Sequence, residues 1–395
     1  MLAFRLPAAA ASRSLVVHLD INKTIAMVDQ AGGKSQLDVC CELTAEQAMG
    51  FCPRPPPTPV SPSDRHGSPT SPPVSWTRLP LPTSVLVTGD RARAAQISSY
   101  KTFVDTVALP LPPPPVDADT VAAIRGERKA LTCHYGRPTS STYEREAWAQ
   151  AQELRDALSR SRDPFVVDAA VALLDAAVTA VASGGLASFG LVFRTFGSEL
   201  DAVRAALARA VDAGVAAAEA AGKPVMAAVW RGLHPAAATT RAAELVRSGT
   251  DAVTMVMDDG RVAAQDVCGV RRELLSHLVA PGAARVMFVR DEFAAWSRAG
   301  EAAHAGKLFA LDGERGQAPA EIFFDDNLRP RDERSIVDVR FVDDDGCEGG
   351  KAAGHHASAA DYARLAAAGH LVHVDPVAVI REPRYFIDRA ERVLQ

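Results

Sequence analysis

The sequence predicts an α/β protein built on a doubly wound, mostly parallel, Rossmann-like sheet. From Asp163 onward, short apolar runs alternate with Ala-rich segments of helical spacing, and several of the apolar runs end in polar residues. Near the start of the chain, the apolar run LVVHL (15–19) ends in Asp20 in the same way. Buried parallel strands have continuous apolar sequences, and strands that alternate with helices are joined by right-handed crossovers.

The individual elements follow from the spacing of apolar residues. Helices are predicted in 164–182, in which apolar residues recur at helical spacing, and in the Ala-rich segment 199–223, which ends near a glycine. Strands are predicted from apolar runs at 15–20, 189–197, 224–230, 252–257, 284–289, 321–326, 336–342 and 370–375. Ligands of such sheets bind at the carboxyl ends of the strands, so we expect a functional site there.

The composition changes between the first strand and the main α/β region. Residues 53–83 are rich in proline and serine and are predicted to be extended or disordered, and a second proline run occupies 109–119. A charged segment from 143 to 160 is predicted to be helical. We therefore expect a core of 14–40 and 163–395, interrupted by an insertion of 41–160. The proline tracts are either tolerated surface insertions or a docking segment for a protein partner.

Charge and composition exclude several classes of partner. The formal net charge of −5 provides no basic surface for nucleic acid or an anionic membrane, and no apolar run is long enough to span a bilayer. Six cysteines without any CxxC spacing suit reduced thiols. The first 13 residues contain Arg, Ala and Ser without acidic residues, which hints at a transit peptide, but a strand begins directly after them. We expect a cytoplasmic protein.

Polar residues suited to phosphoryl transfer occur beside the predicted strands. Asp20 and Thr195 each end a strand, Asp325 and Asp326 end another, and Lys307 precedes that strand in the sequence. A carboxylate nucleophile can form an acyl phosphate, carboxylate oxygens suit Mg²⁺, and hydroxyl and ammonium groups stabilise phosphate charge. These residues therefore predict an Mg²⁺-dependent site for a small phosphorylated molecule.

The same residues resemble the motifs of the haloacid dehalogenase superfamily. HLDINKTI resembles its first motif, VFRTFG its second, the lysine of AGKLF its third and IFFDDN its acidic fourth motif, in the family's order. The set of DxNxT, FRTFG and FFDDN is most similar to uncharacterised members of the superfamily from unicellular eukaryotes. The resemblance covers 14–40 and about 163–395, and the insertion lies where the superfamily carries a C1 cap.

The resemblance implies a role for each matching residue. Asp20 would be the nucleophile and a metal ligand, and the backbone carbonyl of Asn22 would be another ligand. Thr195 and Lys307 would orient the phosphate and the nucleophile. The acidic pair Asp325 and Asp326 would complete the metal site, with Asp325 the leading candidate.

Asn22 departs from the pattern of the superfamily's phosphatases, which place an aspartate at this position. That aspartate protonates the leaving group and then activates water, whereas an amide cannot transfer the proton. General acid–base catalysis contributes on the order of a hundredfold to ten-thousandfold to a rate. Two hypotheses remain open: a hydrolase or phosphotransferase for substrates with good leaving groups, such as acyl or aryl phosphates, or a binding or regulatory protein with little turnover.

Further residues have both a functional and a structural interpretation. Thr24, Arg194 and Gly197 are candidate substrate-binding residues, although Arg194 is as well suited to an ion pair within the fold. Thr195 could instead cap the helix that begins near Glu199. Trp296 is predicted to pack in the core, with a place in the wall of the site as the alternative.

Overall fold

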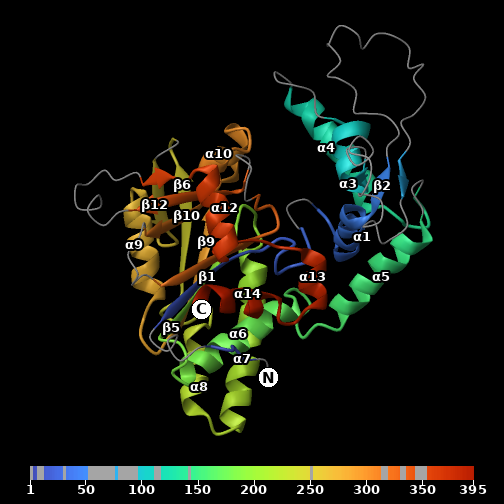
Figure 1. Cartoon of the computed structure of the whole chain (residues 1–395). Coiled ribbons are helices and arrows are strands. Elements are labelled where there is room, and N and C mark those ends of the chain that lie inside the picture. Colours follow the sequence, from blue (N-terminus) through green and yellow to red (C-terminus); the bar gives the residue numbers. More distant parts are fainter. Residues whose placement is uncertain are drawn as a thin grey trace, which may run out of the picture. The chain divides into compact units, whose positions relative to one another are not determined.

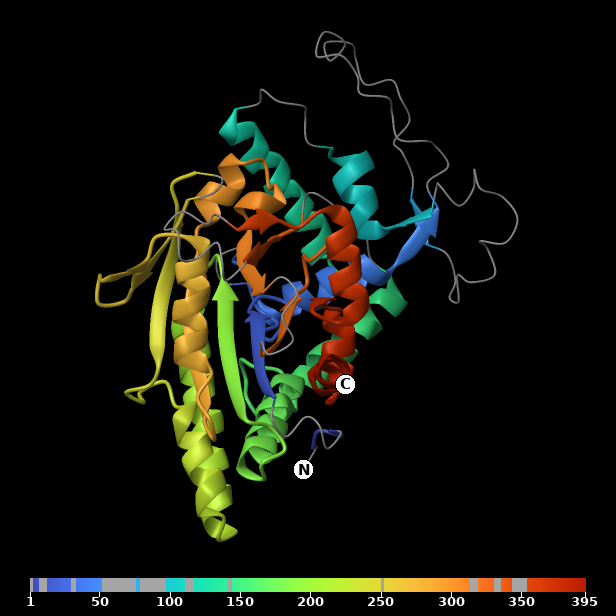
Figure 2. The same cartoon turned by 60° about the vertical axis from the view of Figure 1, so that its left-hand side comes forward.

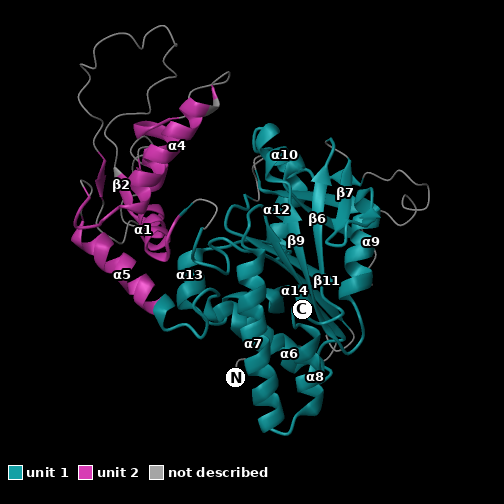
Figure 3. Cartoon of the chain, turned by 180° about the vertical axis from the view of Figure 1, so that it is seen from behind, with its two compact units in different colours: residues 1–33, 158–395 teal, residues 34–157 magenta. Residues whose placement is uncertain are grey.

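The computed structural model describes most of the chain. The described residues are 3–6, 13–29, 33–51, 76–78, 97–110, 117–140, 144–249, 252–312, 319–329, 335–342 and 354–395. Most of the predicted disordered segment 53–83 and most of the second proline run lie outside the described residues. The described residues form two compact units, Met1–Gly33 with Leu158–Gln395 and Lys34–Ala157 (Figure 3).

The first unit contains a mostly parallel sheet of eight strands, in the order β14-β11-β1-β5-β9-β6-β7-β8 (Figure 1). All pairings from β14 to β6 are parallel, and β7 and β8 continue the sheet as antiparallel strands. The strands are β1 (Ser14–Asp20), β5 (Ser188–Thr195), β6 (Arg241–Arg247), β7 (Val253–Met257), β8 (Val262–Ala264), β9 (Ala284–Asp291), β11 (Ala320–Asp325) and β14 (Leu371–His373). The predicted α/β class with a mostly parallel sheet is confirmed.

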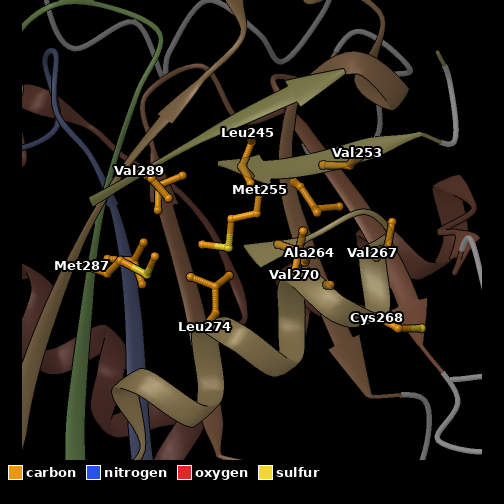
Figure 4. Packing of buried hydrophobic residues seen from close by; sticks show 14 of the residues in the cluster. Leu245, Val253, Met255, Ala264, Val267, Cys268, Val270, Leu274, Met287 and Val289 are labelled. Carbon is orange, nitrogen blue, oxygen red and sulfur yellow. The ribbon is translucent and has the colours of Figure 1, made fainter. Parts of the chain in front are cut away.

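Helices cover both faces of this sheet (Figure 1, Figure 2). The helices α6 and α8 contact the sheet on one side, and α9 packs against β5, β7, β8 and β9. The helices of this unit are α6 (Asp168–Ala182), α7 (Leu200–Ala220), α8 (Pro224–Gly232), α9 (Val267–Leu278), α10 (Phe293–Arg298), α12 (Ala359–Ala368), α13 (Pro376–Arg381) and α14 (Tyr385–Leu394). Figure 4 shows Leu274 of α9 beside Met255 and Met287, buried residues of β7 and β9.

One predicted strand is wrong, because residues 224–230 form the helix α8. Pro224 occupies the beginning of this helix, where its fixed φ is compatible with helical geometry and its missing N–H removes no hydrogen bond. Ala227 and Trp230, three residues apart, are buried, whereas Val225 is 61% exposed. The apolar residues of this run are consecutive, but only one face of the helix is buried. A run of consecutive apolar residues is also typical of a buried strand, so this pattern alone does not distinguish the two.

A second sheet of this unit carries a residue of the predicted site. It has the order β10-β12-β13, with β10 (Lys307–Asp312) parallel to β12 (Val337–Val342) and β13 (His355–His356) antiparallel to β12. The helix α9 also contacts β10 and β12, so this sheet shares its hydrophobic core with the larger one. Lys307 is therefore the first residue of a strand outside the main sheet.

The second unit has its own small core. Its helices and strands are α1 (Gln36–Gln47), β2 (Met49–Phe51), β3 (Thr77–Arg78), β4 (Ile97–Ser99), α3 (Tyr100–Phe103), the π-helix Val104–Ala108, α4 (Ala118–Cys133) and α5 (Arg145–Ser159). The three strands form an antiparallel sheet, and the rings of Tyr100 and Tyr135 stack at 4.4 Å in the core. The boundary at Gly33 and Lys34 assigns α1 to this unit, so residues 34–40 belong to the inserted part.

No helix among the described residues combines the length and the apolarity that a membrane crossing requires.

Gly306 fixes the beginning of β10 and thereby the position of Lys307. A Cβ atom at Gly306 would lie 2.2 Å from the carbonyl oxygen of Ile336, which accepts a hydrogen bond from the Lys307 N–H at 2.7 Å. Backbone atoms occupy the place of the missing side chain, so any substitution must displace the strand that carries Lys307.

We predict that Gly306→Ala lowers the free energy of unfolding by about 1–3 kcal/mol, which is the usual range for overpacking. Urea unfolding of the natural protein and the variant measures this difference. Gly249→Ala is the control, because an added Cβ atom has open space there and this glycine has no positive φ. Equal stability of Gly306→Ala and the natural protein would contradict the assigned close approach.

Candidate functional site

The candidate site lies where the strand order of the main sheet reverses. In the sheet, β5 and β9 lie on one side of β1. The later strands β11 and β14 lie on the other side of β1. The strands β1 and β11 are parallel neighbours, so Asp20 and Asp325 end adjacent strands at the same edge. A reversal of strand order opens a crevice at the carboxyl ends of the strands, which is where doubly wound proteins bind ligands.

Lys307 joins the two aspartates. Its Nζ donates a hydrogen bond to Asp20 Oδ1 and another, of 2.7 Å, to Asp325 Oδ2. The three side chains are almost completely inaccessible to solvent. The structure thus brings together two strand-end residues and one residue of the second sheet that are far apart in the sequence.

Burial and charge together set the protonation behaviour of this group. Burial raises the pKa of the Asp20 carboxyl to about 7, the Lys307 ammonium opposes this shift and the Asp325 carboxylate adds to it. Burial disfavours the charged form of Lys307, but the two carboxylates outweigh this effect and raise its pKa. The lysine is therefore a fixed positive charge beside the carboxylates.

Three acidic side chains of this edge have the arrangement of a possible cation site. Among the described residues, Asp20, Asp325 and Asp326 offer ligand oxygens that all lie within 4.8 Å of one another. Carboxylate oxygens are hard ligands of the kind that Mg²⁺ and Ca²⁺ prefer. Two buried carboxylates face the single ammonium of Lys307, so the group carries excess negative charge that a divalent cation would neutralise. The donor set therefore fits Mg²⁺.

Hydrogen bonds from neighbouring residues hold the aspartates in place. Thr24, which is completely buried, donates from Oγ1 to Asp20 Oδ2 at 3.2 Å. The backbone N–H of Asn327 donates to Asp325 Oδ1 at 2.8 Å, and its side-chain amide donates to Asp326 Oδ1 at 2.9 Å. Thr24, expected to bind substrate, thus contacts the candidate nucleophile.

Asn22 belongs to a hydrogen-bonded group that connects the loops after β1 and β5. Its Nδ2 donates to Glu199 Oε1 at 3.2 Å, and the Thr195 hydroxyl donates to Glu199 Oε2 at 3.0 Å. Glu199 is completely buried, and both of its carboxylate oxygens accept a hydrogen bond. The amide at position 22 therefore has a structural explanation: it donates to a buried carboxylate, which an aspartate at this position would repel.

Gly197 completes the connection between Thr195 and Glu199. Its N–H donates to Thr195 Oγ1 at 2.8 Å, and a Cβ atom at this position would lie 2.1 Å from a Glu199 carboxylate oxygen. The glycine makes room for Glu199, and its N–H is engaged within the loop. The substrate contact of Gly197 expected from the sequence stays a prediction.

Arg194 forms the ion pair that the sequence left as an alternative to substrate binding. Its guanidinium, which is completely buried, donates to the two carboxylate oxygens of Asp291 at 2.5 and 2.9 Å and to the Leu308 carbonyl at 2.8 Å. Arg194 and Thr195 are successive strand residues, so their side chains lie on opposite faces of the sheet. The arginine therefore stabilises the fold and is directed away from Thr195.

Aromatic side chains lie beside Lys307. The ammonium of Lys307 is 5.3 Å from the centre of the Phe196 ring, and Phe196 stacks on Trp296 at 5.4 Å between ring centres. Both rings pack against the buried cluster around β10 and β12, and Phe293 contacts both of them. Trp296 is partly buried and packs against this cluster, and its stacking partner lies next to the site, so its contacts agree with both interpretations from the sequence.

Sequence patterns assign no role to Glu199, Asn327 or Phe293. Glu199 marks only the beginning of a predicted helix, although it follows Thr195 by four residues in RTFGSEL, which places it within reach across a tight turn. Asn327 directly follows Asp325 and Asp326 in the motif FFDDN, so the sequence places it close to both carboxylates. No sequence signal connects Phe293 with Phe196.

Comparisons of the chain with protein-family models, with curated proteins and with solved structures find no match.

We predict that Asn22→Asp lowers the free energy of unfolding by about 1–3 kcal/mol, because it replaces a hydrogen bond with a repulsion between carboxylates. Adding Glu199→Gln should restore most of the lost free energy of unfolding, since the amide introduced at position 199 can donate to the carboxylate introduced at position 22. Urea unfolding of the natural protein, both single variants and the double variant gives the coupling free energy between the two positions. Additive effects of the two substitutions would contradict the proposed role of the amide.

Proposed function

We propose that the chain is a haloacid dehalogenase-like phosphohydrolase or phosphotransferase that acts on a small phosphorylated molecule through an aspartyl-phosphate at Asp20. The observation that carries this proposal is the buried group of Asp20, Lys307 and Asp325 at the reversal of strand order. The ordered motifs of the sequence support the same assignment, and the second unit would correspond to a C1-type cap.

Each residue of the site has a role in this proposal. Asp20 Oδ would attack the phosphorus atom, and Lys307 would stabilise the negative charge of the phosphoryl group. Thr195 would transfer its hydrogen bond from Glu199 to a phosphoryl oxygen when substrate binds. Thr24 would keep the Asp20 carboxylate oriented for attack.

A magnesium ion would supply the remaining charge neutralisation of the phosphate. It would be held by the acidic side chains of Asp20, Asp325 and Asp326 together with the backbone carbonyl of Asn22. The first three fit because they bring hard oxygen ligands together beside a single compensating lysine.

A second candidate function is phosphate-dependent binding or regulation with little turnover. The observation in its favour is Asn22, whose amide is committed to Glu199 and cannot transfer a proton to a leaving group. In this case the same site would bind a phosphorylated ligand, and the inserted unit or the proline-rich segment would contact a protein partner.

Steady-state hydrolysis of para-nitrophenyl phosphate distinguishes the two functions, because an aryl leaving group departs without much protonation. We predict Mg²⁺-dependent turnover that EDTA removes and that Asp20→Asn lowers at least a hundredfold, since the amide is a poor nucleophile. Glu244→Gln, at an exposed position of β6, is a control for a changed carboxylate. Turnover that survives Asp20→Asn would contradict the assigned nucleophile, and a correctly folded but inactive natural protein would favour the binding function.

A further inference from the structure

The ring of Phe293 is the most exposed of the aromatic group that lies beside Lys307. Phe293 begins α10 and is 47% exposed, so much of its ring faces solvent. Its ring meets the edge of Phe196 at 5.8 Å between ring centres and lies 6.0 Å from Trp296. Phe196, Phe293 and Trp296 thus form an aromatic wall.

The aromatic wall is connected to the phosphoryl site by direct contacts. Phe196 directly follows Thr195, and its ring faces the Lys307 ammonium that bonds to Asp20. Phe293 extends this surface from Phe196 toward solvent. A phosphate held by Lys307 would therefore carry its organic group next to rings, of which Phe293 is the most exposed.

The chemistry at position 22 independently restricts the leaving group. The Asn22 side chain cannot donate a catalytic proton, and the structure directs its amide toward Glu199. A leaving group that departs without protonation must be a stable anion, as a phenolate is and an alkoxide is not. A phosphate ester of a phenol needs no general acid at position 22, and its ring can pack against the adjacent aromatic side chains.

Resting on the function proposed above, we propose that the substrate class is aryl phosphates, whose ring packs against Phe293 and Phe196. Asp20 Oδ forms a bond to phosphorus while the bond from phosphorus to the aryl oxygen breaks, and its electron pair leaves with the phenolate. The phenolate then takes a proton from solvent. Water attacks the phosphorus of the aspartyl-phosphate, the bond to the Asp20 oxygen breaks, and inorganic phosphate is released with the proton of the water passing to solvent.

Binding of two non-hydrolysable phosphonates tests the proposal without requiring turnover. In the presence of Mg²⁺, calorimetric titration compares phenylphosphonate with methylphosphonate, which share the charged group and differ in the ring. We expect the natural protein to bind phenylphosphonate about threefold to tenfold more tightly, as contacts between aromatic rings are worth that much. Phe293→Ala should bring the ratio of the two dissociation constants close to one.

Two further variants control for effects on the fold. Phe293→Leu retains apolar volume without a ring and should give an intermediate ratio, and thermal unfolding checks that both Phe293 variants are folded. Val225→Ala removes another exposed apolar side chain, on α8, and should retain the full ratio.

The possible failures are distinguishable. Equal affinity for both phosphonates in the natural protein, or a ratio that Phe293→Ala does not change, would overturn the aryl phosphate class and leave the phosphoryl site standing. Binding of neither phosphonate would overturn the phosphoryl site and the substrate class with it.

Discussion

The ion pairs of Lys307 with Asp20 and Asp325 are the interaction on which the candidate site depends. They connect the first residue of β10, in the smaller sheet, with the last residues of β1 and β11 in the larger one. Burial of a charge is costly unless it is paired and hydrogen-bonded, and removal of one partner leaves an uncompensated charge. The lysine therefore fixes both carboxylates in a position where their excess negative charge favours a cation or requires a proton, which agrees with the raised pKa of Asp20.

Glu199 supplies a second constraint, which explains the amide of Asn22. The buried glutamate accepts hydrogen bonds from Asn22 and Thr195, so it holds together the two loops that follow β1 and β5. Gly197 leaves space for this carboxylate. Since the amide at position 22 is a donor to Glu199, its presence does not by itself indicate a degenerate site. Under the proposed function, the leaving group would depart without help from that position.

The sequence predicted the sheet because buried parallel strands have a strong local signature. The strands β1, β5 and β11, which end in Asp20, Thr195 and Asp325, are predicted for this reason, and their order in the sheet brings these residues to one edge. The sequence does not predict the helix α8, because a short apolar run can form a helix with one buried face or a strand that is buried on both faces. An ion pair within the fold is one of two interpretations of Arg194 from the sequence, and only the three-dimensional structure shows that its partner is Asp291. Glu199 and Phe293 act through contacts across turns and between elements, which local patterns do not encode.

The change in melting temperature caused by Mg²⁺ with beryllium fluoride, which mimics an aspartyl-phosphate, tests the assignment of Asp20 most directly. We expect the two together to raise the melting temperature of the natural protein, because a ligand that binds only the folded state stabilises it. Mg²⁺ alone should have a smaller effect, and Asp20→Ala should abolish the additional increase. The same increase in the natural protein and in Asp20→Ala would contradict Asp20 as the residue that accepts the phosphoryl group.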